Sequence, residues 1–322
     1  MNYLNNEKLN IASQNLKILF EAYLNECQHT KQLRGQTIKG YSEVFSTFQK
    51  IMPEVLTTTD LNPSVLNVFY MRLRTRTRYV GKNTPVVGVK TSTIKTYHNK
   101  LMVFFKWLEF NRFLENTISN KITKPPNPEY EDERALSQSN ISTIISAIAM
   151  NTMDDSFTFK RDILIMSLFI YTGIRRQEML SLKIQDIKFD EGTIFINGKT
   201  SKSKKSRYIP LHPILSNHIK CFLRERRKIK SLSSSLIISC KKDAPFTHHG
   251  LKHWVERYRR LSGVRFHVHQ LRHSFACSLA RENANIITIM NALGHSNIKT
   301  TQGYLRSIRA EESRHFIEKL SF

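Results

Sequence analysis

Apolar side chains in the first part of the chain recur at the three- and four-residue spacing of amphipathic helices. Residues 16–52 contain two such stretches, and a third follows Asn62-Pro63, where proline suits an early helical position. A fourth begins at Thr91-Ser92, which we expect to cap its helix. Residues 81–88 contain glycine and proline and are expected to form a loop. The pattern predicts an all-helical domain over residues 1–124.

The pattern changes at residues 125–134, where three prolines exclude a helix and predict a linker. Beyond it, the continuous apolar run at 163–171 predicts a buried helix, and the segments 193–196 and 207–211 predict two short strands. Residues 135–322 are therefore expected to form a mixed domain, and the whole chain a mainly α fold with a small β-sheet (α+β). Further helices are predicted to begin near Ser137, Pro213, His269, Ile286 and Arg309.

The charge of the chain suggests its partner. The 322 residues contain 50 Lys and Arg against 26 Asp and Glu, a net charge of +24. The excess is spread over both halves rather than gathered in a tail, which favours a nucleic acid partner over a protein that is merely rich in lysine.

Other features of the composition bear on localisation. The four cysteines are scattered and the polar N-terminus lacks a signal-peptide core. The run at 163–171 is too short to span a bilayer. We therefore expect a soluble cytoplasmic protein that does not contact membranes.

Three short segments carry the residues with catalytic potential. In Thr172-Gly173-Ile174-Arg175 and in Leu293-Gly294-His295, a glycine is expected to end a helix and to project the residue that follows. Glu178 lies one turn after Arg175 and can orient its guanidinium through an ion pair.

The third segment, His269 to His273, predicts a helix with a cationic face. His269 and Arg272 are three residues apart and His273 lies beside them, whereas Leu271 and Phe275 belong to an opposite, apolar face. Guanidinium groups bind phosphates through paired hydrogen bonds, imidazoles move protons, and a phenol can attack phosphorus. Because a lone histidine–arginine pair is more often a solvated surface, the three segments must be taken together.

Together they resemble the tyrosine recombinases, or phage integrase family. The resemblance lies in Tyr171 to Leu180, His269 to Ala276, and Leu293 to Tyr304, with matching order, spacing and residue type. It implies a helical, SAM-like core-binding domain before residue 124 and a catalytic tyrosine recombinase domain after the linker. The first domain resembles the family only in its helical pattern.

The resemblance also implies roles for individual residues. Arg175 and Arg272 would bind the non-bridging oxygens of the scissile phosphate, His269 would act in acid–base chemistry, and His295 would donate a second hydrogen bond. Tyr304 would be the nucleophile. Lys199 would be the general acid, although Lys202, Lys204 or Lys205 in the same loop can take that role. Glu178 and His273 would support these groups.

The implied reaction forms a 3′-phosphotyrosyl intermediate and needs neither metal nor cofactor. A zinc site built from His248, His249, His253 and His267 is disfavoured because no acidic or thiol ligands accompany them at metal-site spacing. Double-stranded DNA recombination sites are the implied partner. Further expected DNA contacts are Arg72, Arg74, Arg76, Arg78, Lys90, Lys95, Lys202, Lys204 and Lys205.

The resemblance further implies a homotetramer on two sites, with an accessory DNA-bending protein as an optional partner. A helix after Tyr304 is expected to dock on a neighbouring protomer. Integration or excision of a mobile element is the first expectation. Resolution of chromosome or plasmid dimers, as by Xer recombinases, is the alternative, and the short segment before residue 16 favours it. A type IB topoisomerase and a non-catalytic DNA-binding regulator are alternatives of other classes.

Overall fold

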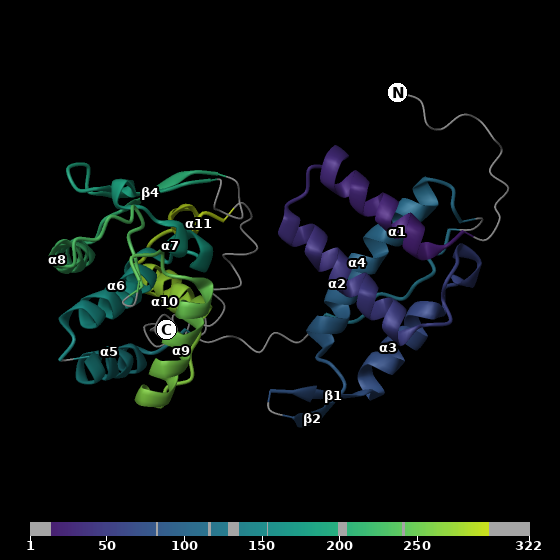
Figure 1. Ribbon diagram of the computed structural model, residues 1–322, viewed down its shortest axis with the longest axis horizontal. Helices are drawn as coiled ribbons and strands as arrows, with labels where there is room; N and C mark the ends of the chain where they lie inside the picture. The colour runs from purple at the N-terminus through teal and green to yellow at the C-terminus, as the bar shows by residue number, and fades with distance from the viewer. Residues whose placement is uncertain are drawn as a thin grey trace, which may run out of the picture. The chain divides into compact units, whose positions relative to one another are not determined.

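The computed structural model describes residues 14–81, 83–114, 117–127, 135–152, 154–198, 205–239 and 242–295. The chain forms two compact units, Met1–Tyr130 and Glu131–Phe322 (Figure 1). The boundary between them falls within residues 125–134, where the prolines lie. None of the described helices is long and apolar enough to cross a membrane.

The first unit is built mainly from helices around an aromatic core. In chain order these are α1 (Leu16–Asn25), a π-helical turn η1 (Glu26–Thr30), α2 (Gly35–Ile51), a 3-10 turn η2 (Thr58–Asp60), α3 (Val65–Thr75) and α4 (Thr91–Phe110). Phe20 of α1 stacks on Phe45 of α2 with ring centroids 3.9 Å apart. Phe104 of α4 meets Phe20 edge-on at 5.0 Å. The apolar positions at helical spacing therefore face one another in the core.

Two helices of this unit begin differently from the prediction. Pro63 precedes α3, which starts only at Val65. Thr91 and Ser92 form the first turn of α4, and neither side chain caps it. Lys90 occupies the cap position, and its carbonyl accepts a 2.9 Å hydrogen bond from the backbone N–H of Thr93.

A β-hairpin interrupts the helices of the first unit, so the prediction of an all-helical domain is wrong here. Strands β1 (Thr77–Val80) and β2 (Thr84–Val87) pair antiparallel, with Tyr79 opposite Pro85. These short segments are rich in β-branched and aromatic residues. Gly88, at φ +72°, closes the hairpin where a Cβ atom would meet the carbonyl oxygen of Arg74 at 2.4 Å. The predicted loop thus contains the turn and the second strand.

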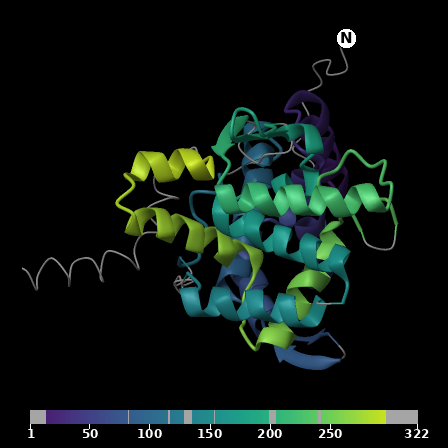
Figure 2. The same cartoon turned by 90° about the vertical axis from the view of Figure 1, so that its left-hand side faces the viewer.

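The second unit combines seven described helices with a small sheet. The helices are α5 (Gln138–Thr152), α6 (Ser156–Thr172), α7 (Arg176–Ser181), α8 (Pro213–Lys228), α9 (His248–Ser262), α10 (Val268–Arg281) and α11 (Ile286–Leu293), with a 3-10 turn η3 (Ile184–Asp186). The apolar run predicted to be buried lies in α6, which packs against α5, α8 and α10. Figure 2 shows α10 and α11 as consecutive yellow-green and yellow helices.

The sheet of the second unit has the order β3 (Ile187–Lys188), β4 (Thr193–Ile196) and β5 (Arg207–Pro210), all antiparallel. The two predicted strands are confirmed, and β3 is an additional one. Ile194, Ile196 and Ile209 are buried against the core, whereas Tyr208 is exposed. The alternation places Arg207, two residues before Ile209, on the inward side of β5. The chain between β4 and β5 passes through residues 199–204, which lie outside the described residues.

Candidate active site

The end of α6 places Arg175. Gly173 follows the helix in the left-handed conformation, at φ +56°, as the sequence predicts. A Cβ atom there would lie 2.3 Å from the ring of Phe275, so the close packing of α6 on α10 also requires glycine. The chain then turns, and Arg175 occupies the N-cap position of α7.

Glu178 is the anionic centre of the site. Its carboxylate is buried, with 1% of the side chain exposed. It accepts hydrogen bonds of 3.0 Å from both the backbone N–H and the Nη1 of Arg175. Arg207 of β5 donates to the same two oxygens, from Nη1 to Oε1 at 3.1 Å and from Nη2 to Oε2 at 2.8 Å. Two guanidiniums thus compensate one buried negative charge and fix its orientation.

Arg272 lies inside the unit, although a histidine–arginine pair taken alone more often marks a solvated helix face. Only 2% of it is exposed, and residues 271–274 are all buried. Its Nη1 donates to the carbonyl of Gly173 and its Nη2 donates to the carbonyl of Leu293 at 2.6 Å. These carbonyls lie at the C-terminal ends of α6 and α11, where the helix dipole favours a cation. Arg272 is buried because two helix ends supply its acceptors.

The end of α11 places His295. Gly294 has φ +63° and ends the helix, as predicted, and the backbone N–H of His295 donates to the carbonyl of Met290 at 3.0 Å. Arg175 reaches the same turn, because its Nη2 donates to the carbonyl of Gly294 at 2.7 Å. The structure therefore brings Arg175, Arg272 and His295 together, although they are far apart in sequence.

The imidazole of His295 is held neutral. Burial, which is the largest cause, and the positive charges of Arg272 and Arg175 together lower its pKa from 6.5 to about 3. Nε2 of His295 lies 2.9 Å from Nη2 of Arg272. Because a guanidinium only donates, Nε2 is the acceptor and the ring proton is on Nδ1.

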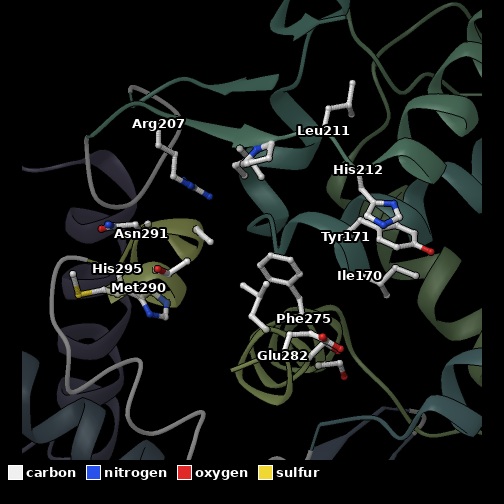
Figure 3. Close-up of a pocket in the computed structure, with 18 of the residues that line it drawn as sticks. Ile170, Tyr171, Arg207, Leu211, His212, Phe275, Glu282, Met290, Asn291 and His295 are labelled. Carbon is white, nitrogen blue, oxygen red and sulfur yellow. The ribbon is translucent and has the colours of Figure 1, made fainter. Parts of the chain in front are cut away.

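A cavity of about 1470 Å³ opens beside these groups. One end is lined by Arg207, Gly294 and His295, and the other end is apolar, with Tyr171 and Phe275 among its residues. Figure 3 shows Arg207 extending from its strand on the same side of this cavity as His295, with Phe275 between them and Tyr171. Arg207 and His295 therefore border an open space, and Arg175 and Arg272 lie behind them through the contacts described above.

The other predicted catalytic residues have different positions. His269 is exposed on α10, and its charge contributes to lowering the pKa of His295. His273 is buried, with 8% exposed. Lys205 is exposed at the start of the segment that leads into β5. Lys199, Lys202, Lys204 and Tyr304 lie outside the described residues, as does the helix predicted after Tyr304.

Residues 134–311 match the phage integrase family, which is more than half of the chain. The chain belongs to the phage integrase family. The tyrosine recombinase XerC of Staphylococcus aureus (strain bovine RF122 / ET3-1) is 27% identical over 290 residues, which cover 88% of this chain and 90% of XerC. The family membership confirms the resemblance seen in the sequence, and the protein is a site-specific recombinase of the tyrosine type.

Solved structures of the family share the fold. XerH bound to palindromic difH substrate, in a post-cleavage complex, is similar with a TM-score of 0.70 and 22% identity over 93% of this chain and 84% of XerH. The Tn1549 transposon integrase in complex with transposon right end DNA gives a TM-score of 0.70 with 16% identity, over 92% of this chain and 98% of that one. These similarities confirm the mainly α fold with small β-sheets.

Arg207 is the site residue of this recombinase that the sequence interpretation did not single out. The segment 207–211 was assigned only as a strand. Strand alternation nevertheless contains a signal, because Arg207 shares the inward side of β5 with buried Ile209. An arginine at an inward position requires a buried partner, and that partner is Glu178.

The basic residues of the first unit differ in their availability for DNA. Arg72 is held by the C-terminal end of α2, since its Nη1 donates to the carbonyl of Ile51 at 2.8 Å and pairs with Glu54 at 2.7 Å. Arg78 donates from Nε to the carbonyl of Gly88 at 2.8 Å and so supports the hairpin. Arg76 is partly buried, and Lys95 donates to the side-chain oxygen of Asn127. Arg74 and Lys90 are exposed.

The histidines considered for zinc do not form a metal site in the described part of the recombinase. His249 and His253 face each other on the exposed side of α9, with Nε2 atoms 2.9 Å apart. His267 instead caps α10 by accepting from the backbone N–H of Gln270 at 3.3 Å. No group of three histidine, cysteine or acidic side chains gathers among the residues that were placed.

Proposed function

We propose that this recombinase cleaves DNA by attack of Tyr304 on a phosphodiester held by Arg175 and Arg272. The observation that carries the proposal is the convergence of both guanidiniums and His295 on the end of α11, beside an open cavity. Preorganised positive charge of this kind stabilises the extra negative charge of a pentacovalent phosphorane. Tyr304 lies nine residues after His295 in sequence, so a short chain connects it to the same place.

The proposed step exchanges one ester for another. The phenolate oxygen of Tyr304 forms a bond to phosphorus, and the bond to the 5′-oxygen breaks. The phenol has an unperturbed pKa of about 10, so it must lose a proton, and the departing 5′-oxygen must gain one. We assign the first transfer to His269 and the second to Lys199 or a neighbouring lysine of its loop. The 3′-phosphotyrosyl ester keeps the energy needed for rejoining, so the exchange needs no energy-supplying cofactor such as ATP.

Trapping the covalent intermediate tests this proposal. The substrate is a duplex that contains the protein's recombination site and a nick, so that the cleaved end diffuses away. Wild-type protein should form a covalent adduct with this duplex that survives a denaturing gel. Tyr304→Phe should bind the same duplex equally well and yield no adduct. An adduct in the Phe variant would refute the assignment. Equal behaviour of both proteins, with no adduct from either, would favour a non-catalytic regulator.

Sequence dependence distinguishes recombination from topoisomerase activity. A recombinase should form the adduct only on a specific site and should join strands from two duplexes. A type IB topoisomerase would relax supercoiled plasmid without sequence preference. Relaxation of plasmids that lack the site would contradict our proposal.

We further propose that four protomers act on two sites and that residues 309–322 dock on a neighbouring protomer. Phe316, Ile317 and Leu320 have helical spacing. The apolar end of the cavity, lined by Ile170, Tyr171, Leu211 and Phe275, suits such a segment. Deleting 309–322 should weaken tetramer formation and recombination but leave binding to a single site intact. Unchanged recombination would refute the docking.

For the biological role we propose integration or excision of a mobile element, with Xer-type dimer resolution as the second candidate. Similarity to the Tn1549 transposon integrase fold supports the first. Similarity to XerC over 90% of its length supports the second. Reactions on paired sites with and without a DNA-bending protein would show whether such an accessory factor is needed. Flanking direct repeats and neighbouring mobilisation genes would favour the mobile element.

A further inference from the structure

Arg207 connects three parts of the second unit. It is the first residue of β5, directly after the segment that holds the candidate general-acid lysines. Its two Nη atoms donate to the two carboxylate oxygens of Glu178. Its side chain also lies against the turn before His295, because a Cβ atom on Gly294 would be only 2.9 Å from its Nη1. The side chain is 11% exposed.

The charges around the end of α11 do not balance. Counting only the groups that are hydrogen-bonded together at this turn, Arg175, Arg207 and Arg272 contribute three positive charges, and Glu178 contributes one negative charge. His295 is neutral. The cluster therefore has two net positive charges. Without Arg207, the carboxylate would cancel Arg175 and only the charge of Arg272 would remain.

A phosphodiester has one negative charge, and the phosphorane formed by attack of a phenolate has two. With Arg207, the two net positive charges of the cluster balance the two negative charges of the phosphorane. Without Arg207, the one remaining positive charge balances only the single negative charge of the substrate. Only interactions that are stronger in the transition state accelerate the reaction. Because both Nη atoms are used on Glu178, Arg207 acts through that carboxylate and through Arg175.

We propose that Arg207 is a positioning residue for cleavage: it neutralises Glu178 and leaves the charge of Arg175 available to the phosphate. This inference rests on the proposed phosphotyrosyl reaction. It adds to that reaction a residue that acts without binding the DNA itself. Through Glu178 and Arg175, this residue determines how much more strongly the site stabilises the phosphorane than the substrate phosphodiester.

The test compares Arg207→Gln and Arg207→Lys with the wild type. The matched control is Arg227→Gln, which removes an exposed arginine of α8 that belongs to neither the site nor the predicted DNA contacts. Each protein is given a nicked duplex with either a normal phosphate or a neutral methylphosphonate at the scissile position. Duplex affinity, single-turnover adduct formation and thermal unfolding are measured for all four proteins.

On the normal phosphate, Arg207→Gln should form adduct about 100-fold more slowly than wild type, the scale expected for losing one charge-stabilising group. Its duplex affinity should stay within about threefold, since both Nη atoms of Arg207 are already engaged by Glu178. On the methylphosphonate the difference should shrink to about tenfold or less, because one negative charge is missing. Arg207→Lys should keep the wild-type ratio of the adduct-formation rate on phosphate to the rate on methylphosphonate. Arg227→Gln should match wild type in every measurement.

Two outcomes would overturn the inference. Equal rates for Arg207→Gln and wild type on the normal phosphate would show that Arg207 is dispensable. An equally large defect on both linkages would show that Arg207 serves only to hold the fold. If Arg207→Gln unfolds, Arg207→Lys decides, because a changed ratio between the linkages in that variant contradicts the charge argument. Failure of the proposed function itself would look different, since wild type would then form no adduct.

Discussion

The two units treat their charged side chains in opposite ways. In the described part of the first unit, residues 14–127, the buried polar side chains are Thr58 and His98, and no Lys, Arg, Asp or Glu is buried. Among its described residues, the second unit buries five charged side chains: Arg161, Asp162, Glu178, Arg226 and Arg272. Charge is thus a surface property in the first unit and part of the interior in the second.

The polar contacts of each unit follow from this difference. In the first unit, His98 is paired with the hydroxyl of Tyr70 at 2.7 Å, and burial lowers its pKa, which favours the neutral form. Between Asp60 and Glu109 the sequence has no acidic residue but nine lysines and arginines. Such a surface attracts a polyanion without demanding fixed geometry. Buried charges, in contrast, need fixed partners, and that requirement creates the geometry of the site.

The largest expected effects come from the two guanidiniums that meet at the end of α11. Arg272→Ala and Arg175→Ala should each slow adduct formation by roughly 100- to 1000-fold, because each removes a donor that stabilises the phosphorane. Single-turnover rates on the nicked duplex, at saturating protein, measure this loss. Near-normal rates in either variant would show that the fixed charges of the second unit do not contribute to cleavage, and the contrast with the surface charges of the first unit would then have no functional meaning.

The next effect separates backbone strain from disturbance of the site. Gly294→Ala puts a Cβ atom 2.9 to 3.0 Å from atoms of Arg207, at φ +63°. Gly192→Ala is the matched control, since Gly192 has φ +59° and nothing within 4 Å. Both should lose about 1 kcal/mol of stability from the left-handed backbone. Only Gly294→Ala should also slow cleavage, by about tenfold, as it displaces Arg207. Equal cleavage by both variants would argue against contact between this turn and the site.

A smaller effect concerns stability against pH. The folded pKa of His295, about 3, lies below its ordinary value of 6.5, so the unfolded chain binds the proton more tightly. The native state should lose stability as the pH falls below about 6.5. His295→Gln should reduce the slope of unfolding free energy between about pH 5 and pH 7, measured by urea denaturation. The remaining slope should come in part from His98 and His218, whose pKa values burial also lowers. An unchanged slope would contradict the neutral imidazole.

The smallest effects belong to the first unit. Arg74→Gln and Lys90→Gln should each weaken DNA binding and reduce the slope of log affinity against log salt by about one, without altering the cleavage rate at saturating DNA. Arg72→Gln is the comparison, because the Arg72 side chain is only partly exposed and is paired with Glu54, so that its role is structural. It should leave the salt slope unchanged. If Arg72→Gln gave the larger change in slope, the distinction between these arginines would be wrong.

Local features of the site were predictable from the sequence, whereas partners distant in sequence were not. Gly173 and Gly294 end α6 and α11 as predicted, because a left-handed helix stop depends on only a few residues. The resemblance predicts Arg272 as a phosphate ligand, but nothing near it in sequence shows that it is buried or that Gly173 and Leu293 supply its acceptors. Arg207 was missed for the same reason, as Glu178 lies 29 residues away.

The fold shows the same division. Long helices such as α2 and α4 have enough turns for their apolar spacing to be recognised. The strands β1 and β2 contain no buried position, so they lack the inward apolar residues that mark β4 and β5, and the second of them resembles a loop that contains Gly81 and Pro85. Family resemblance supplied the roles of Tyr304 and Lys199, which spacing alone does not assign.

The acceptors that hold Arg175 and Arg272 include main-chain carbonyls, at Gly173, Leu293 and Gly294. No amino-acid substitution deletes a main-chain oxygen. A substitution at one of these acceptor positions can therefore weaken the hydrogen bonds of the arginines only by moving the backbone. The backbone is moved most readily by a substitution at Gly173 or Gly294. In a mutational scan, Leu293 should accept other apolar residues of similar size, whereas Gly173 and Gly294 should accept almost none.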